Sequence, residues 1–401
     1  MKCSFSSPST TKCIEFATGN KSHTIMLLSS LPLVFALCFG QGIAQLFTGP
    51  EDPRVVDALT TDTPINGVST TPDGRLFLLY ARVDGSTGPQ VVEYNRTTNT
   101  TIPFPSAEWN NYTMGKDPAT HLIRTNSQRV GPDGSLWLVD TGSPSFGAPV
   151  IFPNGPKLVK VNLTTNEVSR TYSLGNGVFS ASLLDDVRFN PAAGFAYCTD
   201  AGVPGIIIVC LETGEVRRVL NNDPTTGSDI PVSAEGTLLH SPSGSFEFIY
   251  ADHHEVSPDA QYYYYQAASG SMFRIATKWL NQAFYNSTLA NGPLSSYVEP
   301  YAHTPSTGGT AIDAQGNIYD SDTDSQRIIK IAPNGTMTLL VQDPRLLWVD
   351  AMWVDTQGLL WMPAAQLNRG TPFNNGSSYI DKPLHVYTID IGVGPPAIDH
   401  Q

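Results

Sequence analysis

Polar side chains recur at equivalent places along this chain, at a spacing that would bring them together in one site. Six segments share a turn of the form P-D-G or a variant of it, and alignment on that turn selects one equivalent position ahead of each turn. Five of the six selected residues carry a carboxylate or an amide. The six positions hold Asn66, Asn126, Asp185, Asp252, Gly308 and Asp350, and the next positions hold Gly67, Ser127, Asp186, His253, Gly309 and Ala351.

Crowded carboxyl groups raise one another's pKa, so a protonated Asp in such a cluster could pass a proton to or from a substrate beside His253 or His254. That chemistry suits an isomerase, a tautomerase or a cyclase that needs no redox cofactor. The turn context alone also favours Asn and Asp at these positions. We take as candidate catalytic residues Asp185, Asp186, His253 and Asp350.

Two other uses of the same residues stay open. Converging Asp and Asn oxygens could bind calcium, which takes six to eight oxygen ligands and could act as a Lewis acid in a lactonase-type hydrolase. The pocket could instead only bind a small molecule, walled by aromatic rings. The candidate substrate-binding residues are Asn66, Asn126, Trp109, Trp348 and Phe373.

Other chemistries lack their motifs. The sequence has no G-x-S-x-G elbow, P-loop, H-E-x-x-H or dinucleotide-binding glycine fingerprint, and nothing in it indicates NAD, flavin, haem or copper. The formal net charge is -13, and no basic cluster interrupts it, so a nucleic-acid partner is not expected. We expect no resident cofactor and a small molecule as the partner.

The six turn segments predict the elements that must position these residues. They read VSTTPDGRLFLLY, QRVGPDGSLWLVD, VRFNPAAGFAYCTD, HEVSPDAQYYYYQ, TAIDAQGNIYDSD and MWVDTQGLLWMPA. Each joins two short strands through a tight turn, and a further alternating strand follows most copies. Six units of about four strands predict an all-β, six-bladed propeller in one domain over residues 45–401. The segment Arg54–Thr60 would supply the missing strand of the last blade and close the ring.

The N-terminal region indicates export. The uncharged run Ile25–Phe39 has the length of a signal-peptide core, and small residues after it predict a signal peptide over residues 1–44, cleaved after Ala44. Met26 is an alternative start, and a retained signal anchor is the alternative fate. We expect a secreted monomer with no membrane segment after cleavage. Glycosylation is predicted at seven N-x-S/T sites: Asn95, Asn99, Asn111, Asn162, Asn286, Asn334 and Asn375.

Two cysteines, Cys198 and Cys210, remain after the predicted cleavage. They flank a turn-like segment between two apolar runs, and a hairpin turning near Pro204 would place them roughly opposite each other. In a secreted chain this predicts a disulfide, which would leave no thiolate nucleophile. Two free buried thiols are the alternative.

Several of these segments carry a resemblance to a known family. The stretches Pro156–Leu174 and Leu183–Leu220, together with SLWLVDTG and LLWMPAAQLNR, resemble the Yellow/major royal jelly proteins in order and spacing over most of the chain. One departure is that the family's usual Asn-Asp pair stands here as Asp185-Asp186. The resemblance implies a six-bladed propeller with a ligand pocket at one mouth of its channel. It implies no single activity, because relatives include tautomerisation-associated, amine-binding and nutritive proteins.

The overall plan is also similar to that of secreted fungal hetero-Diels–Alderases, which join a tropolone-derived quinone methide to a sesquiterpene. No catalytic motif of that group is matched residue by residue. The leading hypothesis is therefore a cofactor-independent isomerase or cyclase of secondary metabolism. A secreted binding protein without turnover is the second hypothesis, and a calcium-dependent lactonase is the third.

Overall fold

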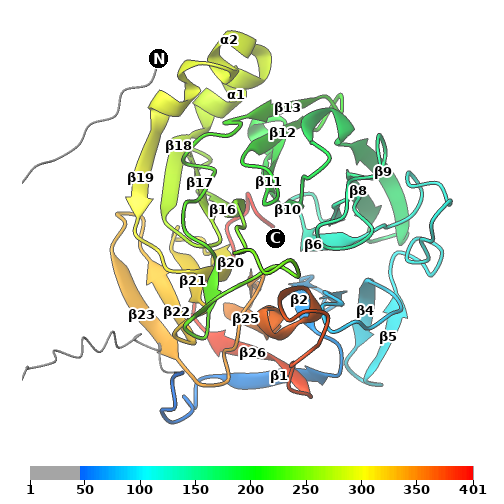
Figure 1. Cartoon of the computed structure of the whole chain (residues 1–401), viewed down its shortest axis with the longest axis vertical. Helices are drawn as coiled ribbons and strands as arrows, with labels where there is room; N and C mark the ends of the chain where they lie inside the picture. The colour runs from blue at the N-terminus through cyan, green and yellow to red at the C-terminus, as the bar shows by residue number, and fades with distance from the viewer. Residues whose placement is uncertain (1–45, 401) are drawn as a thin grey trace, which may run out of the picture. The chain divides into compact units, whose positions relative to one another are not determined.

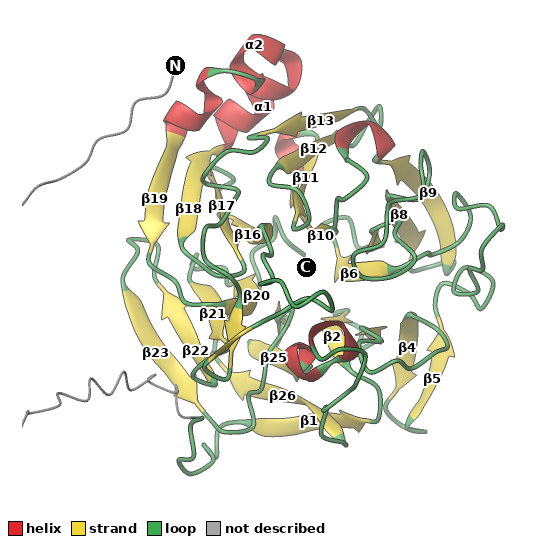
Figure 2. Ribbon diagram, in the orientation of Figure 1, coloured by secondary structure: helices red, strands yellow, loops and turns green. Residues whose placement is uncertain are grey.

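The computed structural model describes residues 46–400, which form one compact unit. Six four-stranded antiparallel sheets are arranged as blades around a central channel, and the C-terminal residues lie at the centre of the ring (Figure 1). Strands and loops make up nearly all of the unit, and the two α-helices lie together at one edge (Figure 2). The predicted all-β, six-bladed propeller is confirmed.

Each blade is a meander whose first strand lies nearest the channel. Blade 1 contains β2 (Ile65–Thr70), β3 (Leu76–Tyr80), β4 (Val91–Asn95) and β5 (Thr100–Pro103). Blade 2 contains β6 (Thr125–Val130), β7 (Leu136–Asp140), β8 (Lys157–Asn162) and β9 (Glu167–Ser173). Blade 3 contains β10 (Leu184–Asn190), β11 (Phe195–Asp200), β12 (Ile206–Cys210) and β13 (Val216–Val219). Blade 4 contains β16 (Ala251–Val256), β17 (Tyr262–Ala267), β18 (Met272–Ala276) and β19 (Val298–Ala302). Blade 5 contains β20 (Thr307–Ile312), β21 (Ile318–Asp322), β22 (Arg327–Ile331) and β23 (Met337–Gln342). Blade 6 contains β24 (Trp353–Val354), β25 (Leu359–Ala364), β26 (Leu384–Asp390) and β1 (Val56–Thr61).

The remaining elements are short. A two-stranded hairpin lies between blades 3 and 4, and two helices join β18 to β19. Their bounds are β14 (Ser233–Ala234), β15 (Thr237–Leu238), α1 (Thr277–Tyr285) and α2 (Ser287–Ala290), with single 3-10 turns at η1 (Gly175–Gly177), η2 (Pro191–Ala193), η3 (Pro293–Tyr297), η4 (Leu367–Arg369) and η5 (Thr371–Phe373).

The ring is closed by the first strand, as predicted. β1 pairs antiparallel with β26, from Val56 opposite Thr388 to Thr61 opposite Leu384. The outermost strand of blade 6 therefore comes from the start of the described chain and its other strands from the end. This arrangement covers the edge of β26, which would otherwise expose unpaired backbone groups.

The repeated turns explain the hairpin between the two innermost strands of each blade. The turn residue has a positive φ in every copy, and glycine adopts that conformation without steric cost. Five copies use glycine for it, and the fourth uses Ala260 at φ 59°. The residues involved are Gly74, Gly134, Gly194, Ala260, Gly316 and Gly358.

The core lies between neighbouring blades. All five residues of β7 are buried, and Leu136 and Leu138 pack in one apolar cluster with Phe77 of blade 1. Burying a side chain of this size contributes about 1.5–3 kcal/mol. Packing between blades therefore holds the inner strands in fixed positions around the channel.

The predicted disulfide is wrong, because both cysteines are free thiols. In the β11–β12 hairpin Cys198 lies opposite Ile207, whereas Cys210 lies opposite Phe195. The two cysteines are thus three positions apart along the ladder, and an odd offset puts their side chains on opposite faces of the sheet. Cys198 packs toward blade 2 with Val209, and Cys210 packs in another cluster with Tyr197.

The predicted signal peptide, residues 1–44, lies outside the described residues. Within residues 46–400, no helix has the length and apolar character required to cross a membrane. The asparagines of all seven predicted glycosylation sites are exposed on the propeller surface. Exposure permits the modification, and the modification itself stays a prediction.

Candidate active site

Irregular pairing between the two innermost strands of a blade turns the side chains of the pore residues toward the channel. In five blades the register between the first and second strand shifts at the positions that the turn alignment selected. In blade 3, for example, Leu184 lies opposite Asp200 and Val187 opposite Cys198, so Asp185 and Asp186 are left out of the ladder. Bulges of this kind turn side chains away from the regular pleat. Here they present consecutive residues to the channel.

A pocket occupies one end of the channel and has a cavity volume of about 90 Å³. Because one water needs roughly 10–15 Å³ on this scale, the pocket has room for several water molecules or a small group of similar size. It brings together all but one of the predicted catalytic and substrate-binding residues. Those that line it are Asn66, Asn126, Asp185, Asp186, His253, Trp348, Asp350 and Phe373.

Trp109 is the exception and lies away from the pocket. It packs, partly buried, against the apolar cluster of blades 1 and 2. Its neighbour Asn110 accepts hydrogen bonds from the backbone N–H groups of Gln90 and Val91, so this loop is fixed along blade 1. The ring of Trp109 therefore stabilises a loop and does not wall the site.

Three carboxyl groups line the pocket together and are called the upper layer here: Asp185, Asp252 and Asp350. Asp185 accepts a hydrogen bond from the Asn126 amide, and Asn126 in turn accepts one from Asn66 at its backbone oxygen. Asp350 accepts a hydrogen bond of 3.0 Å from the indole N–H of Trp348. Among the described residues, none of the three carboxyl groups forms a salt bridge with Arg or Lys.

Their surroundings favour the protonated form of these carboxyl groups. Burial, and then the nearby charge of Asp252, raises the pKa of Asp185 well above its ordinary value. Burial raises the pKa of Asp252 to about 7, and it also raises that of Asp350 well above the ordinary range. We therefore describe Asp185 and Asp252 as a pair that holds at least one proton at neutral pH.

His253 lies beside this pair as a neutral imidazole. Its Nε2 is 2.9 Å from the backbone oxygen of Thr307, which can only accept, so Nε2 carries the hydrogen and Nδ1 is the basic nitrogen. Burial lowers the pKa of His253, against the opposing effect of Asp185. The same Nε2 lies 3.3 Å from Oδ2 of Asp252, so the site places a neutral imidazole directly beside the acid pair.

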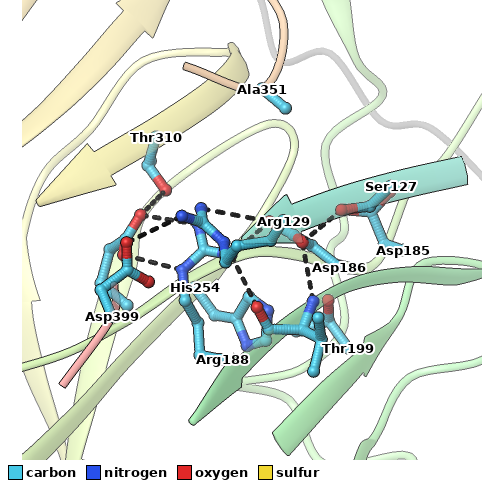
Figure 3. Close-up of polar contacts among 12 residues, drawn as sticks. Ser127, Arg129, Asp185, Asp186, Arg188, Thr199, His254, Thr310, Ala351 and Asp399 are labelled. Atoms are coloured by element: carbon cyan, nitrogen blue, oxygen red, sulfur yellow. Dashed lines mark hydrogen bonds and ion pairs between the residues drawn. The ribbon is translucent and has the colours of Figure 1, made fainter. Parts of the chain in front are cut away.

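Next to this layer lies a set of paired charges, called the floor, and Figure 3 shows its polar contacts among Arg129, Asp186, Arg188 and Asp399. Arg188 makes two hydrogen bonds to Glu255, at 2.8 and 2.9 Å, and another to Asp186. Burial alone would raise the pKa of Asp186, but the adjacent Arg188 and Arg129 hold it below its ordinary value. Asp186 is therefore ionised and paired with Arg188, and its predicted catalytic role stays a prediction.

The chain end completes the floor. Asp399 accepts a hydrogen bond from Arg129 at 2.8 Å and lies 2.7 Å from Nδ1 of His400. The His400 ring stacks on Trp353 with 3.6 Å between the ring centroids, and its Nε2 is 2.8 Å from the backbone oxygen of Val354. The C-terminal residues thus close the channel below the pocket.

Among the charged residues that line the pocket, two had no role in the predictions from the sequence. Asp252 stood in the selected ring but was not among the four catalytic candidates. Arg124 lies just before β6, outside any repeated position, so the turn alignment had no means of selecting it. The nearest signal was its place two residues ahead of Asn126.

The cluster was also tested as a calcium site. One donor atom each from Asp185, Asp252 and His253 lie within 4.8 Å of one another. Calcium takes six to eight oxygen ligands, whereas this group offers two carboxylates and one imidazole. These three groups alone do not make a calcium site, and no residue role proposed below depends on a metal.

The sequence comparison decides the family. The sequence model described as major royal jelly protein matches residues 129–376, which is more than half of the chain. The chain belongs to the major royal jelly protein family. A comparison with curated proteins gives no significant match. The matched region of this family member covers Asp185, Asp252 and Asp350, whereas Asn66 and Asn126 lie before it.

Several solved structures are similar to this major royal jelly protein family member. A luciferin-regenerating enzyme is 13% identical, with 85% of this chain and 96% of that chain covered and a TM-score of 0.51. A regucalcin from Agrobacterium tumefaciens, described as calcium-binding, is 10% identical over 84% and 95%, with a TM-score of 0.49. A virginiamycin B lyase from Staphylococcus aureus is 11% identical over 77% and 80%, with a TM-score of 0.44. At these identities the likeness concerns the fold alone.

Proposed function

We propose that this protein is a secreted small-molecule enzyme of the isomerase or cyclase class that works without a cofactor. The observation that carries the proposal is the group of three pocket carboxyls, Asp185, Asp252 and Asp350, which have no Arg or Lys salt-bridge partner among the described residues and favour the protonated form. A protonated carboxyl donates a hydrogen bond, which an ionised one cannot do. Secretion is part of the proposal and rests on the N-terminal sequence and the exposed glycosylation sites.

In the proposed reaction the Asp185–Asp252 pair donates a hydrogen bond to a carbonyl oxygen of the substrate. Negative charge that develops on this oxygen in the transition state is then stabilised by a group already in place. In a tautomerisation, the acid gives a proton to the oxygen while Nδ1 of His253 removes one from the neighbouring carbon. The two transfers balance, and no electrons leave the substrate.

A hetero-Diels–Alder addition is the more specific form of the proposal. It consumes two π bonds, forms one C–C and one C–O bond, and requires only positioning and a hydrogen bond to the oxygen of the heterodiene. The pocket volume of about 90 Å³ favours one small reactant over two. A second reactant would need the segment around Phe373, which borders the pocket, to move outward.

The test uses purified, glycosylated protein with enolisable ketones and with quinone methides generated in solution. We expect product to form faster than in the spontaneous reaction, and with a different stereochemical ratio. Asp252→Asn should lower kcat by about 10²-fold or more, which is the usual contribution of a general acid. Asp229→Asn, which changes an exposed carboxylate away from the pocket, is the matched control.

The same experiment separates the enzyme from a binding protein without turnover. A binding protein would retain these ligands with no change in rate or product ratio, and that result would contradict the proposal. The lactonase alternative has less support, because Asp185, Asp252 and His253 alone do not make a calcium site.

A further inference from the structure

The guanidinium of an arginine at the pocket wall forms no salt bridge with any residue of the described range. The guanidinium of Arg124 lines the pocket, and its Nη1 is buried without a hydrogen bond to any residue of the described range 46–400. Its Cζ lies 5.5 Å from the centre of the Phe146 ring. A buried guanidinium that lacks acceptors carries a large desolvation cost, which a ligand can offset.

The backbone of Arg124 is held firmly. Its N–H donates to Asp140 at 3.0 Å, and its carbonyl accepts from the N–H and the hydroxyl of Thr141. Asp140 does not neutralise the guanidinium, because it is bound to Lys157 at 2.6 Å and to backbone N–H groups. The position of Arg124 is thus fixed by its backbone, and its side chain is free to bind.

The charges around the pocket act on this cation only at a distance: Asp140 and Asp185 raise its pKa against burial, and neither forms a salt bridge with it. Asp186 is matched by Arg188, and Asp399 by Arg129 and His400. Burial favours the protonated form of Asp185, Asp252 and Asp350, as described above. Burial lowers the pKa of Arg124 only to about 10, so it stays charged at neutral pH.

Aromatic rings lie next to this cation. Phe146 contacts Phe373 edge to face with 5.5 Å between centroids, and both line the pocket. A planar guanidinium binds a carboxylate or a paired set of oxygens through two parallel hydrogen bonds. A flat conjugated ring beside that group would contact Phe146 and Phe373.

We infer that Arg124 binds an oxyanion of the substrate, and that the pocket takes a single conjugated ring bearing a carboxylate or an ionised enol. This inference rests on the proposed function for the role of the pocket, and it adds the substrate class. Arg124 anchors the anionic oxygens near the pocket wall. The ring then reaches toward the carboxyl pair and His253.

The test compares three simple probes of one size: benzoate, neutral benzamide and cationic benzylamine. Dissociation constants are measured at neutral pH and low salt by ligand-observed NMR titration. We expect the wild type to bind benzoate at least about 10-fold more tightly than benzamide, because charge-assisted hydrogen bonds are lost in the amide. Benzylamine should bind more weakly than either.

The variant Arg124→Gln should abolish the preference for benzoate and leave benzamide affinity within about twofold, since only the charge-assisted part is removed. Arg124→Lys should keep part of the preference, because its charge stays but its paired donors do not. Arg96→Gln, an arginine that lies over Trp361 outside the pocket, is the matched control and should bind as the wild type does.

Three results would overturn the inference: benzoate affinity unchanged in Arg124→Gln, tighter binding of benzylamine than of benzoate, or no binding of any probe by the wild type. None of them bears on the acid chemistry, which the Asp252→Asn turnover measurement tests separately. Conversely, a charge preference that depends on Arg124 in a protein without turnover would keep the inference and contradict the enzyme proposal.

Discussion

Asp185 and Asp186 are neighbours on β10 with the same side chain, yet the structure puts them in opposite electrostatic settings. Asp185 belongs to the upper layer of carboxyls, with amides and other acids around it, and its pKa is raised, chiefly by burial. Asp186 belongs to the floor, where Arg188 and Arg129 hold its pKa down against the effect of burial. The comparison shows that acidity along the pore is set by the partners that each layer provides.

The two layers divide the work of the channel. The floor pairs each buried acid with a cation, which holds the inner strands of blades 2, 3 and 4 to the chain end. In the upper layer the acids have no Arg or Lys salt-bridge partner among the described residues, and His253 beside them is neutral, so this layer should add little to stability while its carboxyl groups keep their protons. Stability and chemistry should therefore respond to different substitutions.

The largest effect should come from breaking the floor. Arg188→Met would leave Glu255 and Asp186 buried without their main cation, and we expect the free energy of unfolding to fall by about 3–5 kcal/mol. Urea denaturation followed by tryptophan fluorescence measures it. An unchanged midpoint would show that the floor is not a stabilising network.

A matched pair of substitutions compares the layers directly. Asp186→Asn removes an ionised partner of Arg188 and should destabilise the protein by about 2–4 kcal/mol. Asp185→Asn replaces a carboxyl that favours its neutral form, so its unfolding free energy should change by less than about 1 kcal/mol. Equal losses in the two variants would contradict the division between the layers. Measured turnover should fall in Asp185→Asn despite its normal stability.

The raised pKa values of the upper layer should make the folded protein less stable as the pH rises. Because burial raises the pKa of Asp252 from 3.8 to about 7, the folded state keeps a proton that the unfolded chain releases. The contribution of this residue is therefore most favourable below about pH 4 and is lost as the pH rises through about 7. We expect the melting temperature to fall less over this range in Asp252→Asn than in the wild type. A steeper fall in the variant would contradict the raised pKa.

The sequence predicted which residues line the channel, but it did not predict the charged partners of those residues. The turns with positive φ recur in every blade, so aligning them placed Asn66, Asn126 and Asp185 correctly around one channel. Partners far apart in the chain could not be found in this way. Arg129 and Asp399 are separated by 270 residues, and nothing in the sequence placed the chain end in the pore.

Pairing register was a second limit. The spacing of Cys198 and Cys210 suited a hairpin, but the true register sets them three positions apart on opposite faces. Trp109 has an aromatic ring of the kind that can wall a pocket, but the hydrogen bonds of Asn110 hold its loop against blade 1. Both outcomes depend on backbone contacts that the sequence pattern did not specify.

The smallest expected effect is that of calcium. If the upper layer held this ion, calcium at 100 times its dissociation constant would stabilise the folded protein by about 2.7 kcal/mol. Two carboxylates that favour their protonated form and one imidazole are a poor set for an ion that needs six to eight oxygens. We therefore expect calcium or a chelator to change neither the melting temperature nor turnover measurably. A stabilisation by calcium that Asp252→Asn abolishes would show that this layer binds a cation in place of its protons, and the lactonase hypothesis would then replace the one proposed.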